Sequence, residues 1–220
     1  MPFSLPDAPF IIAVLIALTV HEYAHGLVAY WLGDPTAKYE GRLTLNPVAH
    51  LDPLGTVMFL LIRFGWGKPV PINPRYFKHY RRDTALVAIA GPISNLVLAF
   101  IAFGLFQLFA QRGSEFLTVV QSDNTLYMFG LNILLISISI NLGLMAFNLL
   151  PIAPLDGSKI LVAFIPLKYE DAYERFMSYG TYILLALLIL ERFLNVELLL
   201  WWIRWITGPV LDVMQRLAGV

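Results

Sequence analysis

Long runs of apolar residues are the feature that most restricts how this chain can fold. The stretches at 8–32, 85–109 and 124–150 each provide the roughly 20 residues that a helix needs to cross the hydrocarbon core of a bilayer. The third of them contains no charged residue. Further apolar helices are expected at 179–193 and 197–217, the last either spanning or lying in the membrane interface. The sequence therefore predicts an all-α polytopic membrane protein with about four to six transmembrane helices.

The composition agrees with a membrane environment. Of the 220 residues, 58% are hydrophobic and only 14% are charged, whereas a soluble domain usually has about 25% charged residues. We interpret residues 1–220 as a single membrane-embedded domain that has the lipid bilayer as a partner. The formal net charge of zero argues against nucleic acid as a partner. The absence of cysteine excludes thiolate metal sites and disulfides.

A different pattern follows the first apolar stretch. Residues 42–46, with the sequence RLTLN, alternate polar and apolar side chains between Gly41 and Pro47, which predicts a short β-strand. The next apolar run, residues 54–64, is too short to span comfortably and is a candidate re-entrant element. We therefore expect a small strand or re-entrant element between the first two long helices.

Charged residues in the loops predict the orientation. Residues 63–82 contain six basic residues and no acidic residue. They are Arg63, Lys68, Arg75, Lys78, Arg81 and Arg82. The connection at 112–123 has one basic and two acidic residues. Because cytoplasmic loops carry an excess of Lys and Arg, the 63–82 loop is predicted to be cytoplasmic and the N-terminus to be outside, in a multi-pass protein of the cell membrane.

The first apolar stretch contains the sequence HEYAH at residues 21–25, an H-E-x-x-H pattern. His21 and His25 are four residues apart, so they share one face of a helix and can bind the same ion. Glu22 lies beside them, where a carboxylate can act as general base toward an activated water. Ionisable residues inside a membrane segment are costly and usually functional. This pattern predicts a zinc site, and zinc is only one of the divalent metals it could hold.

A third metal ligand is less clear from the residues alone. Asp156 is the only acidic residue between Asp123 and Glu170, and it follows a charge-free predicted helix. It could complete a two-histidine, one-carboxylate site of the kind that zinc accepts. It could equally be the N-cap of a short helix that begins near Gly157. The two interpretations remain open at this point.

Three motifs in order resemble those of the site-2 protease family. They are HEYAH, AGPISN at residues 90–95, and NLLPIAPLDG at residues 148–157. The resemblance covers nearly the whole chain and fits the compact branch without PDZ or CBS domains. It implies an intramembrane zinc endopeptidase with one Zn²⁺ per chain, held by His21, His25 and Asp156, with Glu22 as the base. It also implies a transmembrane protein as substrate and an active site toward the cytoplasmic side.

Several other polar residues are candidates for supporting roles. By the same resemblance, Asn148 could donate to the oxyanion of the tetrahedral intermediate, or it could form an interhelical hydrogen bond. Asn95 could orient the substrate or cap its helix. For Asn141 we favour an interhelical bond, and for His50 a structural hydrogen bond. Gly91 and its neighbour Ala90 are expected to allow close approach between helices.

Two rival functions fit parts of the same pattern. A metal transporter or channel could use the His/Asp cluster as a transit site, but it would be expected to contain several ionisable clusters. A non-proteolytic membrane scaffold could descend from a protease, but it would be expected to have lost the base or a ligand. Intact Glu22 and Asp156 favour the protease. The substrate is not indicated by the sequence, and a regulatory partner is possible.

Overall fold

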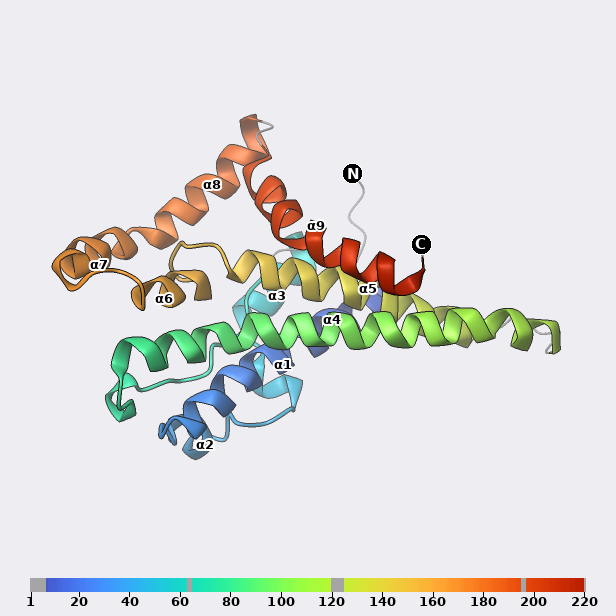
Figure 1. The fold of residues 1–220 in the computed structure, drawn as a ribbon, viewed down its shortest axis with the longest axis horizontal. Helices are drawn as coiled ribbons and strands as arrows, with labels where there is room; N and C mark the ends of the chain where they lie inside the picture. Colours follow the sequence, from blue (N-terminus) through green and yellow to red (C-terminus); the bar gives the residue numbers. More distant parts are fainter. Residues whose placement is uncertain (1–6, 63–64, 120–124, 195–196, 220) are drawn as a thin grey trace.

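The computed structural model describes residues 7–62, 65–119, 125–194 and 197–219, and it is helical throughout (Figure 1). The α-helices are α1 (Ala8–Trp31), α2 (Thr36–Tyr39), α3 (Pro53–Ile62), α4 (Tyr80–Val119), α5 (Thr125–Asn148), α6 (Asp156–Val162), α7 (Glu170–Ser178), α8 (Gly180–Leu194) and α9 (Leu198–Ala218). Three short 3-10 helices are η1 (Pro47–His50), η2 (Pro74–Tyr76) and η3 (Leu167–Tyr169).

Three of these helices are long and apolar enough to cross a membrane: α1, the first part of α4 up to Ala110, and α5. Helix α8 is apolar but has 15 residues, or about 22 Å, which is shorter than a hydrocarbon core of about 30 Å. The part of the chain that the structure describes thus has three helices that are both long enough and apolar enough to span, and a shorter apolar one. This confirms the all-α membrane class and falls short of the four to six full spans that the sequence predicts.

Helix α4 is longer than predicted at both ends. The sequence predicts a helix at 85–109 followed by a connection from residue 112, whereas α4 begins at Tyr80 and continues to Val119. Asp83, in its first turn, accepts a hydrogen bond from the backbone N–H of His79 at 2.9 Å. This bond satisfies one of the backbone donors that a helix N-terminus leaves without an intrahelical partner. The early start of α4 follows from this local cap, which the hydropathy of the sequence does not reveal.

The helices α1, α4 and α5 pack against one another and form the centre of the molecule (Figure 1). Small residues line their contacts. Ala13, Ala17 and Ala29 of α1, Ala99 of α4 and Ala146 of α5 have no exposed surface. Small side chains let helix backbones approach closely, which is how helices associate in a membrane. The packing that positions the polar residues described below therefore uses fully buried alanines together with larger apolar side chains such as Leu142 and Met145.

Helices α8 and α9 form a V-shaped pair beside this centre (Figure 1). Helix α9 lies against α5, where Met214 joins a buried cluster with Leu142 and Met145. The indole Nε1 of Trp202 donates a hydrogen bond to the carbonyl oxygen of Ala146 at 2.8 Å. The pair is therefore attached to α5 both by apolar packing and by one partly buried hydrogen bond.

The strand predicted at residues 42–46 is wrong, because this segment consists of bends and irregular structure. Its polar groups take part in one local bond and one bond to a distant loop instead of forming a ladder. The His50 Nε2 donates to the carbonyl oxygen of Thr44 at 2.8 Å, and the guanidinium of Arg42 donates to the carbonyl oxygen of Lys68 at 2.7 Å. Such side-chain bonds offer the backbone an alternative to strand pairing. Within the described residues, strand-type pairing is limited to an isolated bridge between Leu51 and Gly67.

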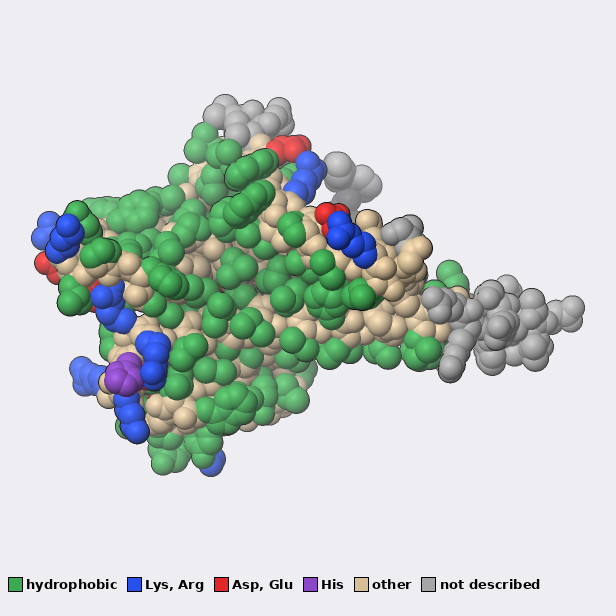
Figure 2. All heavy atoms as spheres, viewed as in Figure 1, with side chains coloured by type: hydrophobic (Ala, Val, Ile, Leu, Met, Phe, Trp, Pro, Cys, Tyr) green, Lys and Arg blue, Asp and Glu red, His purple; other side chains and the backbone are tan. Residues whose placement is uncertain are grey.

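The apolar run predicted at 54–64 corresponds to helix α3. Residues 63 and 64 lie outside the described residues, so Arg63 is the one member of the predicted basic loop without a described position. Hydrophobic side chains cover most of the visible face of the molecule (Figure 2). Lys and Arg side chains gather mainly at the end where α4 begins and near the C-terminal part of α9. This distribution suits a protein that lies in lipid.

Candidate metal centre

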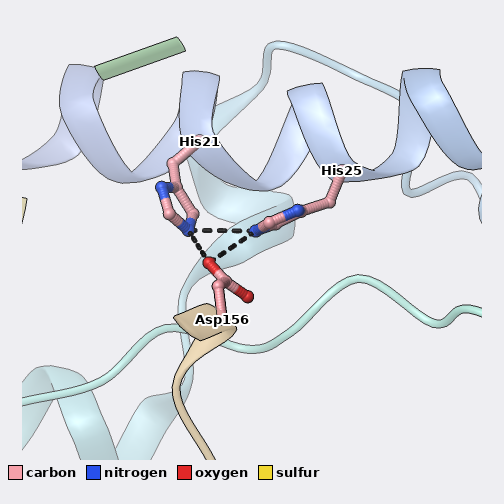
Figure 3. Close-up of side chains that lie close together, drawn as sticks. All are labelled: His21, His25 and Asp156. Carbon is pink, nitrogen blue, oxygen red and sulfur yellow. Dashed lines mark hydrogen bonds and ion pairs between the residues drawn. The ribbon is translucent and has the colours of Figure 1, made fainter. Parts of the chain in front are cut away.

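Three side-chain atoms, from His21, His25 and Asp156, converge on one place, as Figure 3 shows. The Nε2 atoms of His21 and His25 lie 3.0 Å apart, and each is 3.2 Å from Oδ2 of Asp156. The two histidines come from α1 and the aspartate from the start of α6, 131 residues beyond His25 along the chain. The structure therefore brings together the three residues that the sequence and the resemblance suggested as metal ligands.

All three side chains are buried. His21, His25 and Asp156 have relative exposures of 3%, 6% and 5%. Asp156 is the first residue of α6, and Leu155 occupies the N-cap position, where it makes no side-chain capping bond. The carboxylate thus faces the histidines. Asp156 does not serve as the N-cap, which was the alternative that the sequence left open.

The hydrogen bond made by Nδ1 of each imidazole fixes the tautomer of the ring. Nδ1 of His25 lies 2.8 Å from the carbonyl oxygen of Val87, and Nδ1 of His21 lies 2.6 Å from Oδ1 of Asn95. Both partners are acceptors, so each Nδ1 carries the proton and each Nε2 presents a lone pair when the ring is neutral. A histidine that binds a metal usually donates its other N–H to such an oxygen.

The carboxyl group of Asp156 is ionised at neutral pH. Burial by itself raises the pKa of a carboxyl group, but the contacts with the imidazoles of His21 and His25 outweigh burial and hold the pKa of Asp156 well below its usual range. Its Oδ2 is nevertheless buried without a hydrogen bond of ordinary geometry among the described residues. These contacts lower the pKa through an imidazole that carries a proton on Nε2. A bound cation would replace that proton and would meet two imidazole lone pairs and one carboxylate oxygen at one place.

This arrangement fits a zinc ion. Tetrahedral ligands about 2.0–2.1 Å from zinc lie about 3.3 Å from one another, and the three atoms here are separated by 3.0–3.2 Å. Three acceptors at this spacing repel one another unless a cation lies between them. Two imidazoles and a carboxylate are also a known ligand set of catalytic zinc, which keeps a fourth position for water. The residues present are suited to hold the metal.

Two glycines are required by the close packing around the three ligands. A Cβ atom added to Gly91 of α4 would lie 2.5 Å from Cε1 of His21 and 2.5 Å from Nε2 of His25. A Cβ atom added to Gly157 would lie 2.3 Å from the carbonyl oxygen of Leu150. Real Cβ atoms do not approach other atoms so closely. Gly91 therefore makes room for the imidazoles, as the sequence predicts for close helix approach, and Gly157 lets α6 begin directly beneath the end of α5.

Glu22 lies beside the three ligands but is not one of the converging groups. Its Oε2 accepts a hydrogen bond from the backbone N–H of Val70 at 2.9 Å. Val70 stands between Pro69 and Pro71, which have no N–H. Its amide is therefore the only backbone donor in this three-residue segment, and it is used to hold the glutamate. One carboxylate oxygen is fixed in this way, and Oε1 is not involved in that bond.

Asn95 has a position that the sequence did not predict. It is fully buried in the middle of α4, so it caps no helix end. Its Oδ1 accepts from His21, and its Nδ2 donates to Oδ1 of Asn141 at 2.9 Å and to the carbonyl oxygen of Ala17 at 3.2 Å. Asn95 therefore orients an imidazole, and Asn141 makes the interhelical bond that was expected of it. A buried ligand histidine needs an acceptor for its second nitrogen, and this requirement is the signal that could have identified Asn95.

Two further candidates lie apart from this network. Asn148 is the last residue of α5, and its Nδ2 donates to the carbonyl oxygen of Leu144 in the same helix at 3.0 Å. Its action on an oxyanion stays a prediction. His50 is fully buried and bonds the backbone of Thr44, so it has the structural role that the sequence favoured.

Comparisons with known proteins agree with this geometry. The sequence profile described as "Peptidase family M50" matches residues 9–191. YwhC of Bacillus subtilis is 44% identical over 179 residues, which cover 81% of this chain and 79% of YwhC. Rip2 of Mycolicibacterium smegmatis is 29% identical, with 80% of this chain and 64% of Rip2 covered. MJ0611 of Methanocaldococcus jannaschii is 29% identical, with 72% and 75% covered. All three are named as zinc metalloproteases. No solved structure gave a significant match.

Proposed function

Because the chain belongs to peptidase family M50, the zinc metalloproteases of site-2 protease type, we propose that it hydrolyses a peptide bond in or near a transmembrane segment of a membrane protein. The observation that carries this proposal is the convergence of three acceptor atoms in a bundle whose helices are long and apolar enough to cross a membrane. The atoms are His21 Nε2, His25 Nε2 and Asp156 Oδ2. These three residues would be the metal ligands.

The chemistry divides between the metal and the chain. Zinc, when bound, lowers the pKa of a coordinated water toward about 7 and polarises the scissile carbonyl. Glu22 takes the proton of the attacking water and transfers it to the nitrogen of the leaving amine. The bond from Val70 to its Oε2 holds the carboxylate of Glu22, which gives the proton acceptor a fixed position before the substrate arrives.

The supporting residues keep the ligands in place. Asn95 and the Val87 carbonyl hold the two imidazoles in the tautomer that presents Nε2, and Gly91 leaves the space that both rings fill. A helical substrate hides its amide groups in intrahelical bonds, so the segment to be cut must be extended where it meets Glu22. The polar side chain of Asn148, at the end of α5, is the proposed donor to the oxyanion.

The loop charges support a site near the cytoplasmic face. The described basic residues of the 63–82 loop precede or begin α4, and an excess of Lys and Arg marks the cytoplasmic side. Val70 belongs to this loop and contacts Glu22. We therefore place the active site toward the cytoplasm, from which water can reach it.

The test is cleavage of a reporter membrane helix by purified protein in detergent, with the Glu22→Gln variant as the matched comparison. This change keeps the size of the side chain and removes its basicity. Wild-type protein is expected to cleave, and Glu22→Gln to lose cleavage by about 100-fold or more while its metal content stays the same. Equal cleavage by both proteins would contradict the role of Glu22. Metal flux through protein in vesicles without any cleavage would favour a transporter.

A further inference from the structure

A second feature lies away from the metal centre, at the end of the molecule where α4 begins. An open groove of about 700 Å³ separates the first turns of α4 from α6. We call it the interfacial groove. Leu86 and Ile89 of α4 and Ile160 and Phe164 of the α6 region form its apolar part. Its volume is in the range of small-molecule sites.

The other end of the groove is basic. His79, Arg81 and Arg82 line it, and none of its lining residues is acidic. Figure 2 shows Lys, Arg and His side chains gathered at this end of the molecule. The side chain of Arg82 is 62% exposed. It contacts Asp83 through Nε and one terminal nitrogen, at 2.9 and 2.8 Å. A guanidinium has five N–H donors, so donors are left for an anion.

Arg81 has a structural role, because its guanidinium links α4 to the backbone at the end of α6. Its Nε and Nη2 donate to the carbonyl oxygen of Val162 at 2.9 and 2.6 Å, and Nη2 also contacts the carbonyl oxygen of Ile165. Val162 is the last residue of α6, where a cation is favourable, and Ile165 follows the helix. Arg81 thus joins the two helices on either side of the groove, while Arg82 faces outward.

We expect the groove to lie at the depth of lipid headgroups, since α4 is a candidate membrane span. Its basic end coincides with the start of α4, whose span begins at Tyr80. Ile89 is seven residues after Arg82, or about 10 Å further along the helix. The basic end is therefore at headgroup level, and the apolar part extends beside the acyl chains. Basic pockets between membrane helices on the cytoplasmic side bind anionic lipid headgroups.

We propose that the interfacial groove binds an anionic phospholipid of the cytoplasmic leaflet. Its phosphate contacts Arg82 and His79, and an acyl chain lies along Leu86, Ile89 and Ile160. A transmembrane helix is a poorer occupant, because it is about 10 Å across and brings no anion to the guanidinium. Ile160 is one turn beyond Asp156 in α6, so a lipid that bridges α4 and α6 also steadies the helix that carries the proposed third ligand.

Binding can be measured without any protease assay. Delipidated protein is mixed with vesicles of phosphatidylcholine, with or without phosphatidylglycerol, and the lipid that it retains is identified by native mass spectrometry. Wild-type protein is expected to retain phosphatidylglycerol in preference to phosphatidylcholine. Arg82→Gln is expected to weaken this retention about fivefold. Arg75→Gln, the same charge change at an exposed residue of the loop that does not line the groove, is expected to leave retention unchanged.

A second variant protects the test against misfolding of Arg82→Gln, since that change leaves the buried Asp83 with one partner fewer. Leu86→Trp fills the groove from a half-exposed position and is expected to reduce lipid retention as strongly. Val97→Trp, on an exposed part of α4 outside the groove, is the matched control. The proposal is overturned if Arg75→Gln acts like Arg82→Gln, or if Leu86→Trp retains phosphatidylglycerol normally. If Leu86→Trp retains phosphatidylglycerol normally but loses cleavage of the reporter helix, the groove would bind the protein substrate instead of a lipid.

Discussion

The bundle of α1, α4, α5 and α6 and the pair of α8 and α9 are both apolar, but they bury different groups. The bundle encloses His21, His25 and Asp156 together with the two asparagines that support them, and most of these polar atoms have a defined partner. The pair buries Leu184, Leu199 and Met214, and its buried Thr207 bonds only its own helix. The family profile also ends at residue 191, before α9 begins. The comparison places the proposed metal ligands in the bundle and none of them in the pair.

The largest expected effect comes from filling the space beside the imidazoles. Gly91→Val places atoms where His21 and His25 now lie, so zinc binding should weaken by at least about 100-fold and cleavage should disappear. The measurement is zinc content of the purified variant, with Gly104→Val as the control. A Cβ at Gly104, in the same helix, meets nothing within 4 Å. Normal zinc content in Gly91→Val would show that the imidazoles are not fixed as described.

A smaller effect is expected from the residue that orients His21. Asn95→Leu removes the acceptor for Nδ1 and should weaken zinc binding by about 10–100-fold. Asn95→Asp keeps an acceptor oxygen and should bind zinc better than Asn95→Leu. Zinc affinity is measured by competition with a chelator of known strength. If the two variants bind zinc equally weakly, Asn95 acts through packing and not through its bond to the histidine.

A still smaller effect is expected one step further from the metal. Asn141→Leu removes the partner of the Asn95 amide but leaves the bond from His21 to Asn95, so zinc binding should weaken less than in Asn95→Leu. The double variant should bind zinc no more weakly than Asn95→Leu alone, because residues in one network are not additive. If the losses of zinc affinity add in the double variant, Asn141 does not act on the metal centre through Asn95.

The smallest effect is expected in the C-terminal pair. Trp202→Phe keeps most of the apolar contact and loses the hydrogen bond to Ala146, which is worth about 1 kcal/mol. The thermal midpoint in detergent should fall by a few degrees, and zinc content should not change. Loss of zinc from this variant would contradict the distinction between the bundle and the pair, because it would show that the α8/α9 pair affects metal binding.

The sequence predicted much of the bundle because hydropathy and motif spacing are local signals. The apolar stretches marked α1 and α5 within two residues of their ends, and HEYAH placed two histidines on one helix face. Asp156 depended on the family resemblance, since a residue at a helix start can be either a cap or a ligand. Its approach to His21 depends on how α6 packs, which no local pattern contains.

The features that the sequence did not predict depend on contacts between parts of the chain that are distant in sequence. The alternation in residues 42–46 predicts a strand only if a partner strand exists. Here Thr44 bonds the nearby His50 instead, and Arg42 bonds the backbone of Lys68, 26 residues further along the chain. The link from Asn95 to His21 joins residues 74 positions apart. It becomes visible only when α1 and α4 are packed together. Long-range polar contacts of this sort are set by the fold and not by spacing along the chain.

Asp156 is proposed to be the third metal ligand, whereas Glu22 is proposed not to bind the metal. The most direct test is the zinc content of purified wild type, Glu22→Gln and Asp156→Ala, measured under identical conditions. Wild type and Glu22→Gln are predicted to hold about one zinc ion per chain, and Asp156→Ala to be depleted of zinc while it still folds. Full zinc content in Asp156→Ala would contradict the account, because the carboxylate that meets His21 and His25 would then not be needed to hold the metal.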